Sequence, residues 1–145
     1  ARGARLVWEN RPAALAAGAD AGLEFTVREP DGSIGAVEHY LGMSGHAVIM
    51  REDGKVYVHL HQMGTVSQAA QVALRERRPA DTARGALGRR LTESGTLAAH
   101  SGPQQILEGR AAFPYAFPEP GTYRVWVQVK RQGVVETASF RVQVN

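Results

Sequence analysis

Apolar and polar residues alternate with a period of two in several segments, which is the pattern of strands with one buried face. Near the start of the chain, Leu23, Phe25 and Val27 alternate with charged or polar neighbours. Near the end, two valine-rich runs alternate over 123–129 and 140–144. Both ends of the chain are therefore predicted to be β-structure.

Shorter apolar segments complete the predicted set of strands. We expect short strands at 6–8 and 37–41, an edge strand within 12–21, and a further strand over 111–117. Turn signals rich in proline and glycine separate these segments. Short strands at such spacing predict a mainly β fold, an immunoglobulin-like antiparallel β-sandwich.

The alternation stops between residues 64 and 110. Residues 67–78 are rich in good helix formers, and Pro79 would end a helix there. A second short helix is expected near 83–91, and the remainder has the composition of a loop. The chain therefore predicts an insertion over 64–110 that is helical over about 65–92.

Composition narrows the range of functions. A length of 145 residues fits one domain, 1–145, with a sizeable core. The absence of cysteine excludes disulfides, thiolate metal sites and cysteine nucleophiles. The net charge of +3 is small, and the arginines are not interleaved with aromatic residues on a recognisable module. No nucleic-acid partner is expected.

The chain begins at Ala1 and not with methionine. It contains no visible signal peptide and no apolar stretch of transmembrane length. We expect a processed product or a piece of a longer protein, with any membrane tether outside the visible chain.

A β-hairpin is predicted around Asp53 and Gly54, which lie between the extended segments 46–51 and 55–61. Asp-Gly between apolar runs is a strong hairpin signal, and a two-residue turn would fix the register of the strands. The cross-strand pairs expected from this register are Glu52–Lys55, Met50–Tyr57, Val48–His59 and His46–His61.

Three histidines would then lie together on one face of the hairpin. Side-chain alternation places His46, His59 and His61 opposite the apolar face. Directly opposed Cβ atoms are roughly 4.5–5.5 Å apart. Imidazoles at that spacing can share one ion, with metal–nitrogen bonds of about 2 Å. The pattern therefore predicts a site for a transition metal, copper or zinc.

Further ligands are available near the ends of the two strands. Met43 and Met63 offer thioether sulfurs, which would favour copper(I), and His39 is a candidate fourth ligand. An alternative interpretation stays open: histidines on an exposed sheet face can form a polar cluster, and methionines often fill gaps in packing.

No catalytic set is recognisable. Ser44 lies near His46, but there is no nucleophile elbow, no acid partner, no P-loop and no dinucleotide fingerprint. We expect a noncatalytic metal-binding domain. The rival is a structural or interaction module that binds a protein partner through a sheet edge or the helical insertion. A third interpretation is a metal-dependent enzyme with an open coordination position.

Two segments resemble a group of bacterial extracytoplasmic domains. The first comprises VEHYLG at 37–42, GHAVI at 45–49 and VHLH at 58–61, and the second is FPEPGTYRVWVQ at 117–128. They resemble the immunoglobulin-like sandwiches of the YtkA-like and copper-resistance type. This resemblance implies a periplasmic or extracellular location and makes copper, or another transition metal, the expected ligand.

The second segment also carries a structural prediction of its own. Its Pro-Gly-x-Tyr pattern places Tyr123 at the beginning of a strand. A tyrosine there can anchor a sandwich corner through a hydrogen bond to the backbone.

Overall fold

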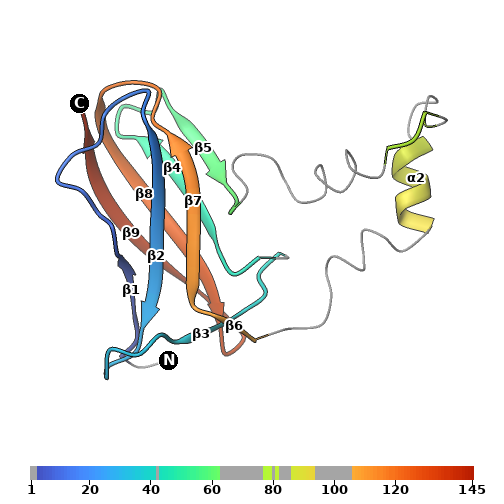
Figure 1. The fold of residues 1–145 in the computed structure, drawn as a ribbon, viewed down its shortest axis with the longest axis horizontal. Coiled ribbons are helices and arrows are strands. Elements are labelled where there is room, and N and C mark those ends of the chain that lie inside the picture. The colour runs from blue at the N-terminus through green and yellow to red at the C-terminus, as the bar shows by residue number, and fades with distance from the viewer. Residues whose placement is uncertain (1–2, 42, 63–76, 80, 82–85, 94–105) are drawn as a thin grey trace.

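Two antiparallel β-sheets form the body of the protein in the computed structural model (Figure 1). The structure describes residues 3–41, 43–62, 77–79, 81, 86–93 and 106–145. The smaller sheet has the strand order β1-β2-β7. Its strands are β1 (Arg5–Trp8), β2 (Asp20–Arg28) and β7 (Arg110–Ala116).

The larger sheet is built around β8, an eleven-residue strand. Along one edge, β8 pairs with β4 and then with β3. β9 pairs with β8 over the whole length of β8. β5 and β6 form the outer strands beyond β4 and β3. The bounds are β3 (Ala36–Glu38), β4 (His46–Arg51), β5 (Tyr57–Leu60), β6 (Ile106–Glu108), β8 (Gly121–Arg131) and β9 (Val134–Val144).

The core lies between the two sheets, where their alternating apolar residues meet. Phe25 of the smaller sheet packs against Phe113 and Phe140, with ring centroids 6.0 and 5.2 Å apart. Ile49 and Val125 of the larger sheet are completely buried. The period of two seen in the sequence therefore marks the faces that are removed from water, which is the main stabilising term of a sandwich.

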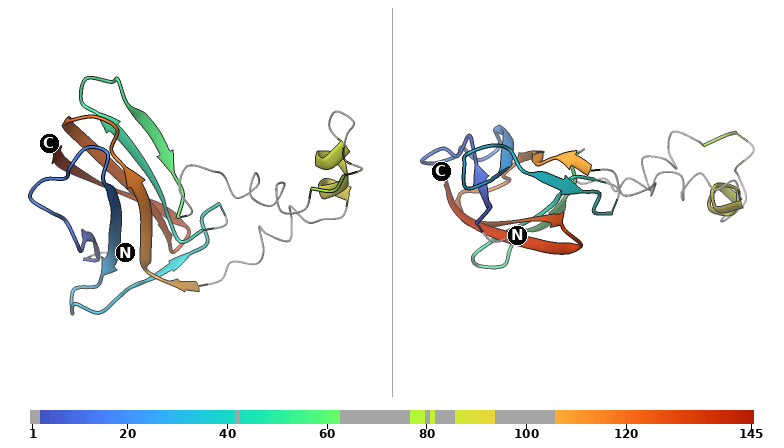
Figure 2. Two further views of the ribbon diagram at one scale, coloured as in Figure 1. Left: turned by 45° about the horizontal axis from the view of Figure 1, so that its top comes forward. Right: turned by 90° about the horizontal axis from the view of Figure 1, so that it is seen from below.

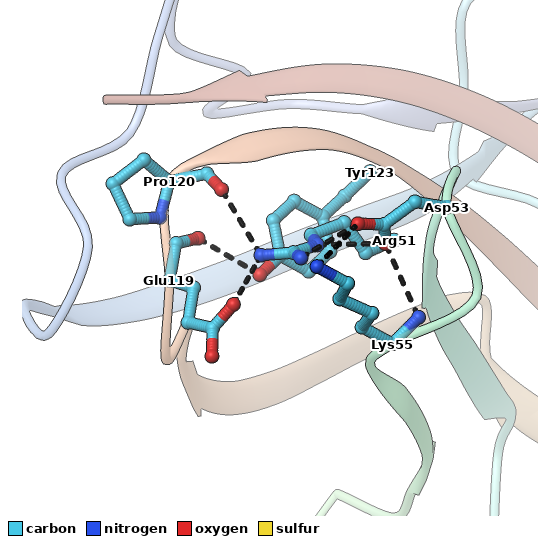
Figure 3. A network of polar contacts seen from close by, with 6 residues as sticks. All are labelled: Arg51, Asp53, Lys55, Glu119, Pro120 and Tyr123. Atoms are coloured by element: carbon cyan, nitrogen blue, oxygen red, sulfur yellow. Dashed lines mark hydrogen bonds and ion pairs between the residues drawn. The ribbon is translucent and has the colours of Figure 1, made fainter.

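The predicted tyrosine corner is confirmed. Tyr123 is completely buried, and its hydroxyl donates a 2.8 Å hydrogen bond to the carbonyl of Glu119. Arg51 joins the same corner to the β4–β5 turn (Figure 3). Its guanidinium binds both carboxylate oxygens of Asp53 and also contacts Glu119. The guanidinium lowers the pKa of Asp53 to about 2, so the pair stays ionised in neutral solution.

Two predicted elements near the N-terminal half need correction. The edge strand expected within 12–21 is reduced to one parallel bridge between Leu15 and Val144, and β2 already begins at Asp20. The strand expected over 37–41 covers only Ala36–Glu38. Short-range propensity places strands but fixes their ends poorly, because pairing with neighbours decides how far each continues.

The predicted helical insertion is not supported as a whole. Within the described residues, helix occurs only in α2 (Ala86–Glu93), which lies apart from the sheets in Figure 2. Most of the helix expected over 67–78 falls outside the described residues, and the described residues 77–79 are not helical. Residues 106–108, expected to be loop, form β6. None of the described helical residues makes a span long and apolar enough to cross a membrane.

Candidate metal centre

The β4–β5 hairpin has the predicted register. Met50 pairs with Tyr57, and Val48 pairs with His59. The apolar residues Ala47, Ile49 and Leu60 face the core and are buried. The other face carries the histidines, as side-chain alternation requires.

The turn differs from the predicted two-residue turn. The N–H of Arg51 donates to the carbonyl of Val56, and the N–H of Gly54 donates to the carbonyl of Arg51. Four residues, 52–55, therefore form the loop, and Gly54 takes the left-handed conformation with φ 78°. The expected pair of Glu52 with Lys55 does not form, because the N–H of Glu52 binds Thr122. The predicted strand register is nevertheless observed, because the four-residue loop 52–55 and the predicted two-residue turn are both centred between Asp53 and Gly54.

Three imidazoles lie together at the open end of this hairpin. The ring centroids are 5.4 Å apart for His46 and His59, 5.1 Å for His46 and His61, and 4.7 Å for His59 and His61. One nitrogen of each ring can be chosen so that all three lie within 4.8 Å of one another. Three nitrogens each about 2 Å from a shared ion are separated by less than about 4 Å. Small side-chain rotations would therefore close the group around one ion.

The three rings differ in their exposure to solvent. His46 is 3% exposed, His61 is partly buried and His59 is exposed. His46 begins β4, which lies between β5 and β8, whereas His59 belongs to the outer strand β5. The cluster therefore has a buried inner imidazole, His46, and an exposed outer one, His59.

A backbone carbonyl determines which nitrogen of His46 carries the proton. Nε2 of His46 lies 2.8 Å from the carbonyl oxygen of Tyr40. Because a carbonyl only accepts hydrogen bonds, Nε2 is the protonated nitrogen of the neutral ring. The ring of Tyr40 also packs edge-on against His46, with centroids 5.3 Å apart.

The other nitrogen of this ring is buried without a partner. Nδ1 of His46 and Nδ1 of His61 both make no hydrogen bond within the part of the chain that the structure describes. A buried polar atom without a partner costs about 1–3 kcal/mol. The lone pair on Nδ1 of His46 fits a bound cation, and Nδ1 of His61 would accept the same ion in the tautomer that carries its proton on Nε2.

Burial favours the neutral imidazole at His46 and His61. Burial lowers the pKa of His46, and repulsion from His61 and His59 adds to this effect against the opposing hydrogen bond to Tyr40. Burial also lowers the pKa of His61, with a further contribution from His59. Neutral imidazole is the form that binds metals, so protons compete weakly at these two residues.

The other candidate ligands are not all brought to this cluster. The group of described histidine and acidic side chains that could hold an ion contains the three histidines, and His39 is not among them. Met43 is buried at the turn before β4. Met63 lies outside the described residues. The hydroxyl of Ser44 donates to the carbonyl of Arg110, which is a structural role.

Sequence reasoning missed the support behind His46. The Tyr40 carbonyl is a backbone atom, so no side-chain motif reports it. The glycine at position 45 was the signal that the sequence did offer. In the structure, a Cβ added to Gly45 would lie 2.9 Å from the carbonyl oxygen of Gln128. A glycine directly before His46 therefore lets this segment press against β8.

Comparisons with known proteins give a family but no activity. A family model described as "Domain of unknown function (DUF8832)" matches residues 3–145. No curated protein matches the chain. Among solved structures, the chain is similar to the PKD domain from the human VPS10 domain-containing receptor SorCS2, with 17% identity and a TM-score of 0.37. That alignment covers 99% of this chain and 73% of the other.

Proposed function

Because the chain belongs to the DUF8832 family, whose function is unknown, we propose a function from its own residues. The domain binds a transition-metal ion, copper or zinc, through His46, His59 and His61. The observation that carries this proposal is the convergence of three imidazoles with ligand atoms within 4.8 Å. The two buried Nδ1 atoms without partners support it.

Three nitrogen ligands leave part of the coordination sphere open. Zinc and copper both accept imidazole, whereas an added thioether would favour copper(I). Of the two methionines expected as further ligands, Met43 is the one among the described residues, three residues before His46. The open position is available to water or to a ligand from another molecule.

We place the domain outside the cytoplasm, periplasmic or extracellular, and in the immunoglobulin-like class of sandwiches. The tyrosine corner at Tyr123 and the two antiparallel sheets support that class. The resemblance to the copper-resistance type of domain at 37–42, 45–49, 58–61 and 117–128 supports the location and the preference for copper.

Calorimetric titration tests the proposal directly. Metal-stripped protein should bind one equivalent of zinc or copper(II), and replacing any of His46, His59 or His61 by alanine should weaken binding. The His39→Ala variant is the matched control, because it removes an imidazole that lies outside the three-histidine group. Binding that is indifferent to all three changes would refute the site, as would the absence of stoichiometric binding.

One observation favours a second function, a protein-interaction module without a metal role. β5 is an outer strand, and Tyr57 on it is 67% exposed. Arg51 and Val56 form a hydrogen-bonded pair, and hydrogen-bonded and non-hydrogen-bonded pairs alternate along antiparallel strands. The backbone N–H and carbonyl groups of Tyr57 and His59 therefore point away from β4. Such an edge can accept an extended segment of another protein. A failed metal titration would leave this function as the better one.

A further inference from the structure

The segment before β4 constrains His46 through the backbone. Tyr40 and Met43 exchange two backbone hydrogen bonds, of 2.8 Å from the N–H of Tyr40 and 3.2 Å from the N–H of Met43. The carbonyl of Tyr40 therefore accepts from Met43 and from Nε2 of His46 at once. Both of its lone pairs are used, so the carbonyl is held in place by the turn and aimed at the imidazole.

Leu41 within this turn has an unusual backbone conformation. Its φ is 51°, in the left-handed region that residues with a Cβ rarely adopt, and its side chain is 70% exposed. Burial of the leucine side chain therefore does not explain the conformation. A strained turn persists where the surrounding contacts determine it, and such turns gather at functional sites.

Met43 and the two residues that follow it are held in place as well. Met43 is buried, and Ser44 is tied to the smaller sheet by its hydrogen bond to Arg110. Gly45 lies so close to β8 that its position has no room for a side chain. The backbone that carries His46 is thus held in place, and its ring is oriented through Nε2 by the carbonyl of Tyr40 before any ion arrives.

From this geometry we infer that the Tyr40–Met43 turn is the positioning element of the metal centre, holding His46 so that the ion is bound through Nδ1. The inference rests on the proposed function. Metal-binding histidines commonly donate their second N–H to a carbonyl, which fixes the tautomer and the orientation of the ring. Nδ1 of His61, the second buried nitrogen without a partner, supplies the adjacent ligand.

Nuclear magnetic resonance of protein with ¹⁵N-labelled histidine tests this assignment, because the two ring nitrogens of each neutral tautomer have different chemical shifts. In metal-free protein at pH 8, we expect the proton of His46 on Nε2 and a bare Nδ1. Adding zinc should change the Nδ1 resonance and leave the Nε2–H in place. A proton on Nδ1 in the metal-free protein would overturn the inference.

The outcomes with zinc separate this inference from the proposed function. Zinc bound to Nε2 of His46 would leave the proposed function intact and overturn the role of the turn. Zinc that leaves all three imidazoles unchanged would overturn both.

Two substitutions of Leu41 test the turn itself. Leu41→Gly keeps the left-handed conformation without strain, whereas Leu41→Val introduces a β-branched residue that disfavours it. Both remove the same exposed leucine. We expect Leu41→Val to weaken zinc binding roughly 10-fold or more and to mix the two tautomers of His46, and Leu41→Gly to bind like the parent protein. Equal zinc affinity and an unchanged tautomer in Leu41→Val would overturn the inference.

Discussion

Replacing His59 by alanine separates metal binding from folding. His59 is the exposed member of the cluster and lies on an outer strand. Substitutions at exposed positions change stability by about 0.5 kcal/mol or less. Metal-free His59→Ala should therefore unfold at nearly the temperature of the parent protein, in contrast to a change at the buried His46.

The expected rise in unfolding temperature follows from the free energy of zinc binding. An ion present at 100 times its dissociation constant stabilises the folded state by about 2.7 kcal/mol. For a chain of 145 residues, each kcal/mol raises the unfolding temperature by about 4 °C. Thermal unfolding followed by circular dichroism should then show a rise of roughly 10 °C for the parent protein. The rise should largely disappear in His59→Ala at the same zinc concentration.

A matched variant controls for histidine content. His39→Ala also removes one imidazole, and His39 is outside the group that could hold an ion. It should keep the full zinc-dependent rise. If His59→Ala responds to zinc as strongly as His39→Ala does, the three-histidine arrangement is refuted.

Three further predictions concern the scaffold, each measured by urea denaturation. Tyr123→Phe removes a buried hydrogen bond and should destabilise the protein by about 1–3 kcal/mol. The hydroxyl of Tyr115 makes no hydrogen bond among the described residues, so Tyr115→Phe should destabilise the protein by less than about 0.5 kcal/mol. Burial lowers the pKa of His46 below the ordinary 6.5, so the unfolded chain takes up the proton first. Metal-free protein should therefore lose stability as the pH falls below about 6.5, and His46→Gln should show a smaller loss; equal losses would contradict the reasoning. Gly45→Ala should destabilise by about 1–3 kcal/mol, because its Cβ would meet a backbone carbonyl at 2.9 Å, whereas Gly22→Ala has open space and should be neutral or stabilising.

The strands that the sequence predicted well are those with strict alternation. Leu23, Phe25 and Val27 lie in β2, and each is 1–2% exposed. Tyr123 and Val125 lie in β8 and are fully buried. A period of two has only one arrangement that buries every apolar side chain, so local pattern and global fold agree there.

Predictions failed where pairing with a distant strand decides the outcome. β6 pairs with β3 across more than sixty residues, and nothing in its three residues marks it as a strand. The 12–21 segment has apolar residues, yet before β2 begins at Asp20 the bridge of Leu15 to Val144 is its only β-pairing. Short segments gain their structure from partners that the local sequence does not specify.

The sequence by itself determined the location of the candidate site. The hydrophobic alternation on both sides of Asp53 and Gly54 was enough to place His46, His59 and His61 on one face, because a strand has only two faces and the core takes one of them. Their difference in burial and the tautomer of His46 were decided by the tertiary structure. β4 is flanked by two strands whereas β5 is an outer strand, and the carbonyl of Tyr40 reaches Nε2 of His46 only in the folded chain, where Tyr40 pairs with Met43. Burial and backbone hydrogen bonds are properties of neighbours in space, and these neighbours exist only in the folded chain.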